Sequence, residues 1–141
     1  MVGFMYERVH KRGLADFGDL ASRAPTLAFF FGFSTLASIG LPGLNGFVGE
    51  FMALSGAMAA LPVLAIVGSV GVLLSAAYAL PAFQAVFWAP AGPGSVSEKM
   101  SDLHLREKAI LWTMCGLMAW IGLAPKPWLA WFEPAIRGLV R

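Results

Sequence analysis

Long apolar segments alternate with short polar ones along the chain. Residues 6–23 are polar and carry seven formal charges, whereas Glu50 is the only formal charge between Ala24 and Ser97. Four apolar segments follow from this pattern, at residues 24–41, 46–60, 62–89 and 106–123. A helix of about 20 apolar residues crosses the hydrocarbon core of a bilayer. The pattern therefore predicts an all-α, multi-pass fold of about four transmembrane helices.

The polar segments predict surface structure at both ends of the helices. Residues 90–105 are rich in Pro, Gly and Ser and form a loop, in which Ser101 or Asp102 is expected to cap the following helix. The tail, residues 124–141, mixes Trp and Leu with Glu and Arg, which is typical of an amphipathic interfacial helix. Residues 1–23 are expected to be the end of an upstream helix followed by a surface loop. Their apolar residues precede the charges, which reverses the order of a signal peptide.

The segment "LPGLNG", residues 41–46, interrupts an otherwise apolar region. Pro42 disfavours the α conformation at Leu41, and Gly43 and Gly46 allow backbone conformations that are closed to other residues. Both flanks are apolar, so the break is expected at membrane depth. Irregular backbone at that depth is tolerated only where protein or a water-filled cavity surrounds it. We therefore expect one discontinuous helix with its break at 41–46.

Composition supports lipid as the solvent. The chain of 141 residues is 58% hydrophobic and only 13% charged, with a mean hydropathy of +0.72. A soluble domain usually has about 25% charged residues. The net charge of +2 and the lack of a basic run argue against nucleic acid as a partner. Cys115, His10 and His104 are isolated in the sequence and predict neither a disulfide nor a metal site.

Glu50 is the candidate functional residue. An ionisable group inside a membrane costs at least about 2.5 kcal/mol at a helix centre, so it indicates function by default. A carboxyl group next to a discontinuous helix suits proton or ion transfer, while a purely structural, hydrogen-bonded carboxylate remains the alternative. Ser38 is a secondary polar candidate. The residues expected to form the break and its water path are Pro42, Gly43, Asn45, Gly46 and Gly49.

Three stretches resemble one known family. "LASIGLPGLNGFVGEF" resembles the discontinuous-helix signature of the antiporter-like subunits of proton-pumping NADH–quinone oxidoreductase, respiratory complex I. "YERVHKR" resembles the segment before it, and "LHLREKAILW...GLAPKPWL...FEP" resembles the last spanning helix and tail. The M-type subunit of that family has glutamate at the position of Glu50, where the L- and N-type subunits usually have lysine. The M-type subunit is therefore the best match.

The resemblance implies a role and a setting. Glu50 would be the proton-relaying acid at the outlet of a channel, and Arg106 and Glu107 match the family's Arg-Glu pair at the start of the last helix. The chain resembles helices eleven to fourteen of fourteen. NADH, FMN, iron–sulfur clusters and quinone would be bound by other subunits, with no cofactor in this chain. L- and N-type subunits would be its partners in the inner (plasma) membrane.

The sequence leaves two alternative functions open, and its two indications of membrane orientation disagree. A multisubunit Na⁺/H⁺ antiporter subunit would usually have lysine in place of Glu50, and a truncated assembly fragment would transfer nothing. With four crossings, seven Lys and Arg residues lie on the side of the N-terminal loop and the tail, against three on the side of the 90–105 loop. The positive-inside rule then puts both ends in the cytoplasm. The resemblance implies the reverse orientation.

Overall fold

The computed structural model describes residues 1–11 and 13–139, and these contain helices and loops without a strand. The predicted all-α fold is confirmed. The helices are α1 (Val2–Val9), α2 (Leu20–Arg23), α3 (Pro25–Ser38), α4 (Asn45–Ala60), α5 (Pro62–Phe87), α6 (Leu105–Leu123) and α7 (Lys126–Leu139), with short 3-10 helices η1 (Leu14–Asp16) and η2 (Ser97–Lys99). Helices α3 to α6 overlap the four predicted apolar segments.

Proline starts two of the apolar helices. Pro25 and Pro62 occupy the first positions of α3 and α5, where the missing N–H of proline would have no partner inside the helix. Pro81 lies inside α5, which continues through it as a helix of 26 residues. Among the described residues, α5 is the one helix that is long and apolar enough to cross a membrane alone. Helix α6 and the first part of α7 pass the same test only as a pair, bent by 76°.

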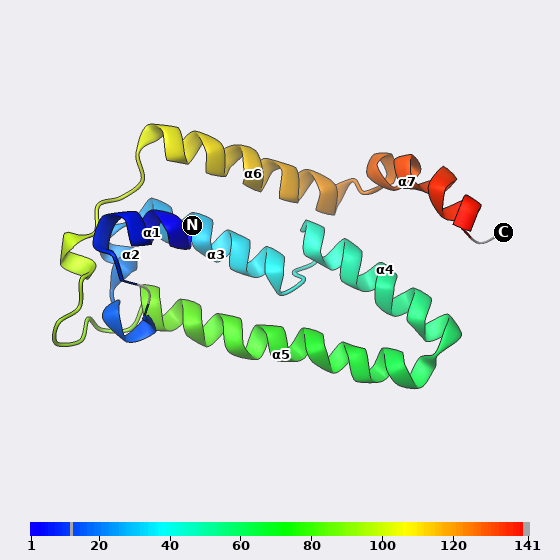
Figure 1. The fold of residues 1–141 in the computed structure, drawn as a ribbon, viewed down its shortest axis with the longest axis horizontal. Helices are drawn as coiled ribbons and strands as arrows, with labels where there is room; N and C mark the ends of the chain where they lie inside the picture. The colour runs from blue at the N-terminus through cyan, green and yellow to red at the C-terminus, as the bar shows by residue number, and fades with distance from the viewer. Residues whose placement is uncertain (12, 140–141) are drawn as a thin grey trace.

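Helices α3 and α4 follow one another in the same direction, and α5 returns alongside both (Figure 1). The Phe83 ring of α5 covers Gly32 in the middle of α3, while Leu54 of α4 lies over Gly68 of α5. Helix α6 runs beside α3, and its Trp112 ring lies 5.4 Å from the Phe30 ring. The pair α3–α4 therefore makes one interrupted pass through the fold.

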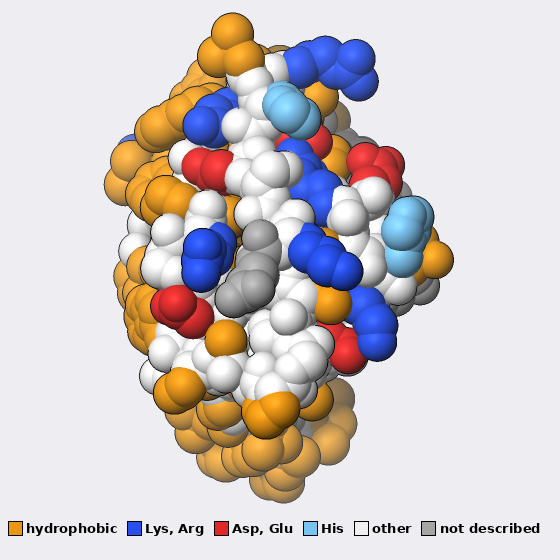
Figure 2. Space-filling model, turned by 90° about the vertical axis from the view of Figure 1, so that its left-hand side faces the viewer, with side chains coloured by type: hydrophobic (Ala, Val, Ile, Leu, Met, Phe, Trp, Pro, Cys, Tyr) orange, Lys and Arg blue, Asp and Glu red, His pale blue; other side chains and the backbone are white. Residues whose placement is uncertain are grey.

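This arrangement corrects the predicted sidedness of the loops. Asp19 N donates to Ala89 O at 2.6 Å and Val96 N donates to Asp16 O at 2.9 Å. The N-terminal loop and the 90–105 loop thus lie at the same end, where Figure 2 shows the charged side chains gathered. Their predicted placement on opposite sides is wrong, because residues 24–41 and 46–60 run end to end rather than back and forth. The count of seven basic residues against three rested on that placement and does not hold.

The buried core lies at this polar end. Phe30, Phe87, Leu20 and Leu27 are its largest fully buried side chains, and they come from α2, α3 and α5. By contrast, the outer side chains of α4 and α5 are exposed, as the exposed fractions of 71% for Val63 and Leu73 illustrate. Such surfaces require lipid or protein around them. The largest buried cluster therefore lies at the polar end, while Ala37, Leu44 and Ala65 are buried away from it.

Asp102 ties the 90–105 loop to α3. Its carboxylate accepts hydrogen bonds from the backbone N–H groups of Thr26 (3.3 Å) and Leu27 (3.1 Å), at the first turn of α3. Partial burial raises the pKa of Asp102, but hydrogen bonds from Thr26, Leu103 and Leu27 outweigh it, so the pKa is lower than usual. The expectation that Ser101 or Asp102 caps α6 is wrong, because the N-cap of α6 is His104. At α6 it is Glu107 that accepts from the backbone N–H of His104, at 2.7 Å.

A half-buried ion pair attaches α1 to α6. Arg8 donates to Glu107 Oε2 at 2.6 Å and to the carbonyl of Phe4 at 2.9 Å. The guanidinium also donates to Ser101 in the loop, at 3.2 Å. Arg8 therefore connects α1, the 90–105 loop and the start of α6.

Replacing Asp102 with alanine is expected to lower the free energy of unfolding by about 1 kcal/mol, the usual loss for a helix N-cap. Because the folded state lowers the pKa of Asp102, its stabilisation is present above the ordinary value of 3.8 and is lost as the pH falls below it. Thermal unfolding in detergent, at neutral pH and in strong acid, measures both effects. Asp102→Asn keeps an acceptor oxygen and should lose less. Equal melting temperatures for Asp102→Ala and the parent chain at neutral pH would contradict the assignment.

Candidate functional site

The first half of the break is a regular helix C-terminus. Leu41 N donates to Leu36 O at 3.0 Å and Gly40 N donates to Ala37 O at 3.4 Å, which is the hydrogen-bond pattern of the Schellman motif. The motif needs a left-handed residue, and Gly40 supplies it with a φ of 75°. Gly40 was not among the residues predicted from the sequence, although a glycine just after a helical run is a known stop signal.

The second half of the break depends on two further glycines. Gly43 adopts a φ of 95°, which turns the chain so that Leu44 N donates to Leu41 O at 3.1 Å and α4 begins at Asn45. Gly46 lies directly against the carbonyl of Ala37, where a Cβ atom would overlap the oxygen. The break expected from the sequence is present, and Gly43 has the special backbone conformation expected of it. Gly46 does not, because it is a helical residue of α4 and its lack of a side chain instead allows the close approach to Ala37. The water path of the break stays a prediction.

The last turn of α6 covers the break. Gly122 packs backbone to backbone against Gly43 and Leu44, because a Cβ on Gly122 would overlap the carbonyl of Gly43 and the Cα of Leu44. Leu123, the next residue, lies beside Gly43. The backbone of Gly43 and Leu44 is thus covered by protein, whereas Leu41 and Pro42 are exposed. Irregular backbone at membrane depth requires such cover or a water-filled cavity. Sequence spacing alone gave no signal for Gly122.

Glu50 lies in the second turn of α4 and reaches back over the break. It is partly buried, and its carboxylate lies on Gly40, so closely that a Cβ there would overlap Oε2. Within residues 1–11 and 13–139, no side chain forms a hydrogen bond or ion pair with Glu50. The structure therefore presents one carboxyl group, without a fixed polar partner in the described part, at the junction of two half-helices.

The other polar side chains of α3 and α4 divide into two groups. Asn45 lies in the break, and its Oδ1 is buried with no hydrogen-bond partner among the described residues. Ser38 donates to the carbonyl of Ser34 at 2.9 Å, and Thr35 and Ser55 likewise bond carbonyls of their own helices. Gly49 is exposed, with no atom within 4 Å of a built Cβ. Of this set, Asn45 alone offers an unused polar atom beside the break.

Arg106 and Glu107 lie far from Glu50. They begin α6, whereas Gly122 near its end packs on the break, about 22 Å away along the helix axis. Glu107 pairs with Arg8, and Arg106 is exposed. The structure gives Glu107 an anchoring position at the polar end and does not bring either residue to the candidate site.

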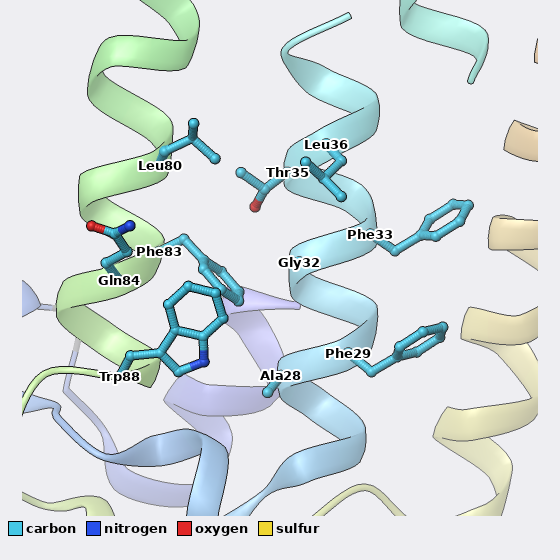
Figure 3. A pocket seen from close by; sticks show the side chains of 10 residues that line it. All are labelled: Ala28, Phe29, Gly32, Phe33, Thr35, Leu36, Leu80, Phe83, Gln84 and Trp88. Atoms are coloured by element: carbon cyan, nitrogen blue, oxygen red, sulfur yellow. The ribbon is translucent and has the colours of Figure 1, made fainter. Parts of the chain in front are cut away.

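Two hollows flank α3. One, of about 310 Å³, lies between α3 and α5, and Figure 3 shows the rings of Phe83 and Trp88 pointing into it toward Gly32. Its lining is apolar apart from Thr35 and Gln84. The other, of about 450 Å³, is lined by four hydroxyl side chains, those of Ser34, Thr35, Ser38 and Tyr78, together with Met1, Val2, Phe31 and Ala79. Neither hollow includes Glu50 in its lining.

The described residues form no evident metal-binding site. No group of three or more His, Cys, Asp or Glu side chains comes together there. A carboxyl group such as that of Glu50 can gain and lose a proton without a cofactor.

Comparison with known proteins identifies relatives along the whole chain. The family model "NADH:quinone oxidoreductase/Mrp antiporter, TM" matches residues 1–75. NADH-quinone oxidoreductase subunit M of Rhodobacter capsulatus is 37% identical over 140 residues, covering 99% of this chain and 27% of that protein. The same subunit of Mycobacterium tuberculosis is 35% identical over 136 residues, covering 96% and 24%.

A solved structure agrees in fold. A chain of respiratory complex I from Thermus thermophilus with bound NADH superposes with a TM-score of 0.79 at 39% identity, covering 87% of this chain and 25% of that one. This chain thus spans about a quarter of the length of the curated relatives that it matches.

Gly122→Ala is expected to destabilise the fold by about 1–3 kcal/mol, the usual cost of overpacking, because the backbone of Gly43 and Leu44 cannot rotate away as a side chain could. Gly116→Ala is the matched control, since Gly116 lies in the same helix with no atom within 4 Å of its built Cβ. That control should be neutral or slightly stabilising. Unfolding in detergent compares the two variants, and equal effects would refute the backbone contact.

Proposed function

The chain belongs to the NADH:quinone oxidoreductase/Mrp antiporter membrane family, and from this membership we propose that it carries a proton-transfer site of an M-type subunit of respiratory complex I. In this proposal, Glu50 accepts a proton from water on one side of the break and releases it toward the other side. The chain contributes to proton translocation coupled to quinone reduction elsewhere in the complex. The subunit M relatives support the M-type assignment that Glu50 indicated.

The observation that carries the proposal is the position of Glu50. It is the only formal charge between Ala24 and Ser97, and its carboxylate lies at the junction of α3 and α4. A charge in an apolar region is costly and is retained where it has a function. A broken helix beside an ionisable group is a recurring feature of the ion sites of transporters.

A route for water is supported by the hydroxyl-lined hollow beside α3. It reaches Ser38, which lies two residues before Gly40 in the sequence. Hydroxyl groups that donate to carbonyls of their own helix still have lone pairs that accept hydrogen bonds from water. We propose this hollow as one approach to Glu50, with the buried Oδ1 of Asn45 as a further acceptor near the break.

The proposed setting draws on the relatives. The solved relative is a respiratory complex I, so the proposed partners are the other membrane-arm subunits, of the L- and N-type, and the lipid of the inner (plasma) membrane. NADH, FMN, iron–sulfur clusters and quinone would be bound by other subunits. The chain would take part in the oxidoreductase as a proton-translocating component without a redox site of its own.

Glu50→Gln is expected to lower proton translocation by at least about tenfold, because the amide cannot exchange a proton as a carboxyl group does. The measurement is the rate of proton uptake into inverted membrane vesicles, normalised to the amount of assembled complex. Glu50→Asp keeps an acid and should retain more of the rate.

Glu107→Gln serves as a second control, because Glu107 pairs with Arg8 at the far end of α6. It is expected to alter stability more than translocation. Unchanged translocation in Glu50→Gln would overturn the proposed function and favour a structural carboxylate.

A further inference from the structure

We propose that Gly40 is a positioning residue for Glu50, and that the space left by its missing side chain holds the carboxyl group against the end of α3. The functional consequence rests on the proposed role of Glu50 in proton transfer. The geometric statement about where the carboxyl group lies does not depend on that role.

The contact involves the whole carboxyl group. A Cβ built on Gly40 would overlap Glu50 Oε2 and would lie 3.0 Å from Cδ and 3.4 Å from Oε1. Any side chain at Gly40 would therefore occupy the position of the carboxyl group. The other glycines of the break do not meet Glu50. A Cβ on Gly43 would make ordinary contact with Leu123, and a Cβ on Gly46 would overlap the Ala37 carbonyl.

Gly40 is held in place by its own hydrogen bonds. The bonds from Gly40 N to Ala37 O and from Leu41 N to Leu36 O close the Schellman motif around it. Its backbone cannot shift away from Glu50 without breaking the end of α3. Glu50, in contrast, is on a flexible side chain, so an added methyl group would displace the carboxyl group rather than the backbone.

The position also matters chemically. The end of a helix presents carbonyl oxygens, which accept hydrogen bonds, and an ionised carboxylate only accepts as well. A protonated carboxyl group has one O–H to donate. Holding Glu50 on Gly40 therefore places its carboxyl group where the protonated form can donate to backbone or water. Moving the group away would separate it from the junction between α3 and α4.

Gly43 provides a matched control. It also has a positive φ, 95° against 75° for Gly40, so alanine imposes comparable backbone strain at either position. A Cβ on Gly43 would meet only Leu123 Cδ2, at an ordinary 3.7 Å. The two alanine variants thus differ mainly in whether the new methyl group meets Glu50.

The test uses the assembled membrane complex that contains the chain, with Gly40→Ala and Gly43→Ala compared by electron cryomicroscopy and by proton translocation. In Gly40→Ala we expect the Glu50 carboxyl group to leave its position and translocation per assembled complex to fall by about fivefold or more, the effect of one unfavourable rotamer. In Gly43→Ala we expect Glu50 to stay in place. An unmoved Glu50 in Gly40→Ala, or an equal displacement in both variants, would overturn the proposal.

A double variant covers the case in which Gly40→Ala does not assemble. Gly40→Ala combined with Glu50→Ala removes the side chain that meets the new methyl group, so the complex should assemble again. If this double variant does not assemble while Gly43→Ala assembles normally, backbone strain at Gly40 is the cause of the assembly defect. That result would overturn the proposal.

The two proposals fail in different ways. Normal translocation in Glu50→Gln would remove the proton role of Glu50. The position of its carboxyl group in Gly40→Ala would still decide whether Gly40 holds it.

Discussion

Backbone hydrogen bonding in an apolar environment is the constraint on which this structure depends. Each unpaired N–H or C=O group at membrane depth costs several kcal/mol, so a helix can be interrupted there only if its ends are otherwise satisfied or covered. The Schellman motif at Gly40 pairs the last carbonyls of α3, and the turn at Leu41–Leu44 pairs one more. Gly122 of α6 then covers the backbone of Gly43 and Leu44. The break thus depends on contacts among α3, α4 and α6 and is not a local defect of one helix.

The polar end of the molecule fixes which part of α6 lies against that break. Asp102 holds the start of α3, and Arg8 together with Glu107 holds the start of α6. Because the two helices start from one anchored loop and run side by side, the length of α6 brings Gly122 to the end of α3. Asp102, Arg8 and Glu107 therefore set how α3 and α6 are aligned along their lengths, although all three lie far from the break. The tight core of Phe30, Phe87 and Leu27 reinforces the same register.

Glu50 gains its significance from this geometry. A carboxyl group on a continuous helix would project from one face of that helix alone. Here α4 starts next to the end of α3, so a residue in its second turn reaches back across the junction and lies on Gly40. The proposed proton transfer uses this placement, since the group is accessible to both half-helices and is not committed to a fixed ion pair within the described residues. Glycine at position 40 is what leaves room for it.

The sequence by itself determined the all-α class, the apolar segments, the break near Pro42 and the isolated acid Glu50, because each follows from local composition and local conformational preference. The resemblance to antiporter-like subunits was also readable from "LPGLNGFVGEF". Only the tertiary structure decided that α3 and α4 make one interrupted pass, that both polar loops share an end, and that Asp102 caps α3 instead of α6. It alone revealed the contacts of Gly40 with Glu50 and of Gly122 with Gly43. These depend on pairs of residues that are distant along the chain, and the hydrophobic pattern of one segment carries no information about which partner its backbone will meet.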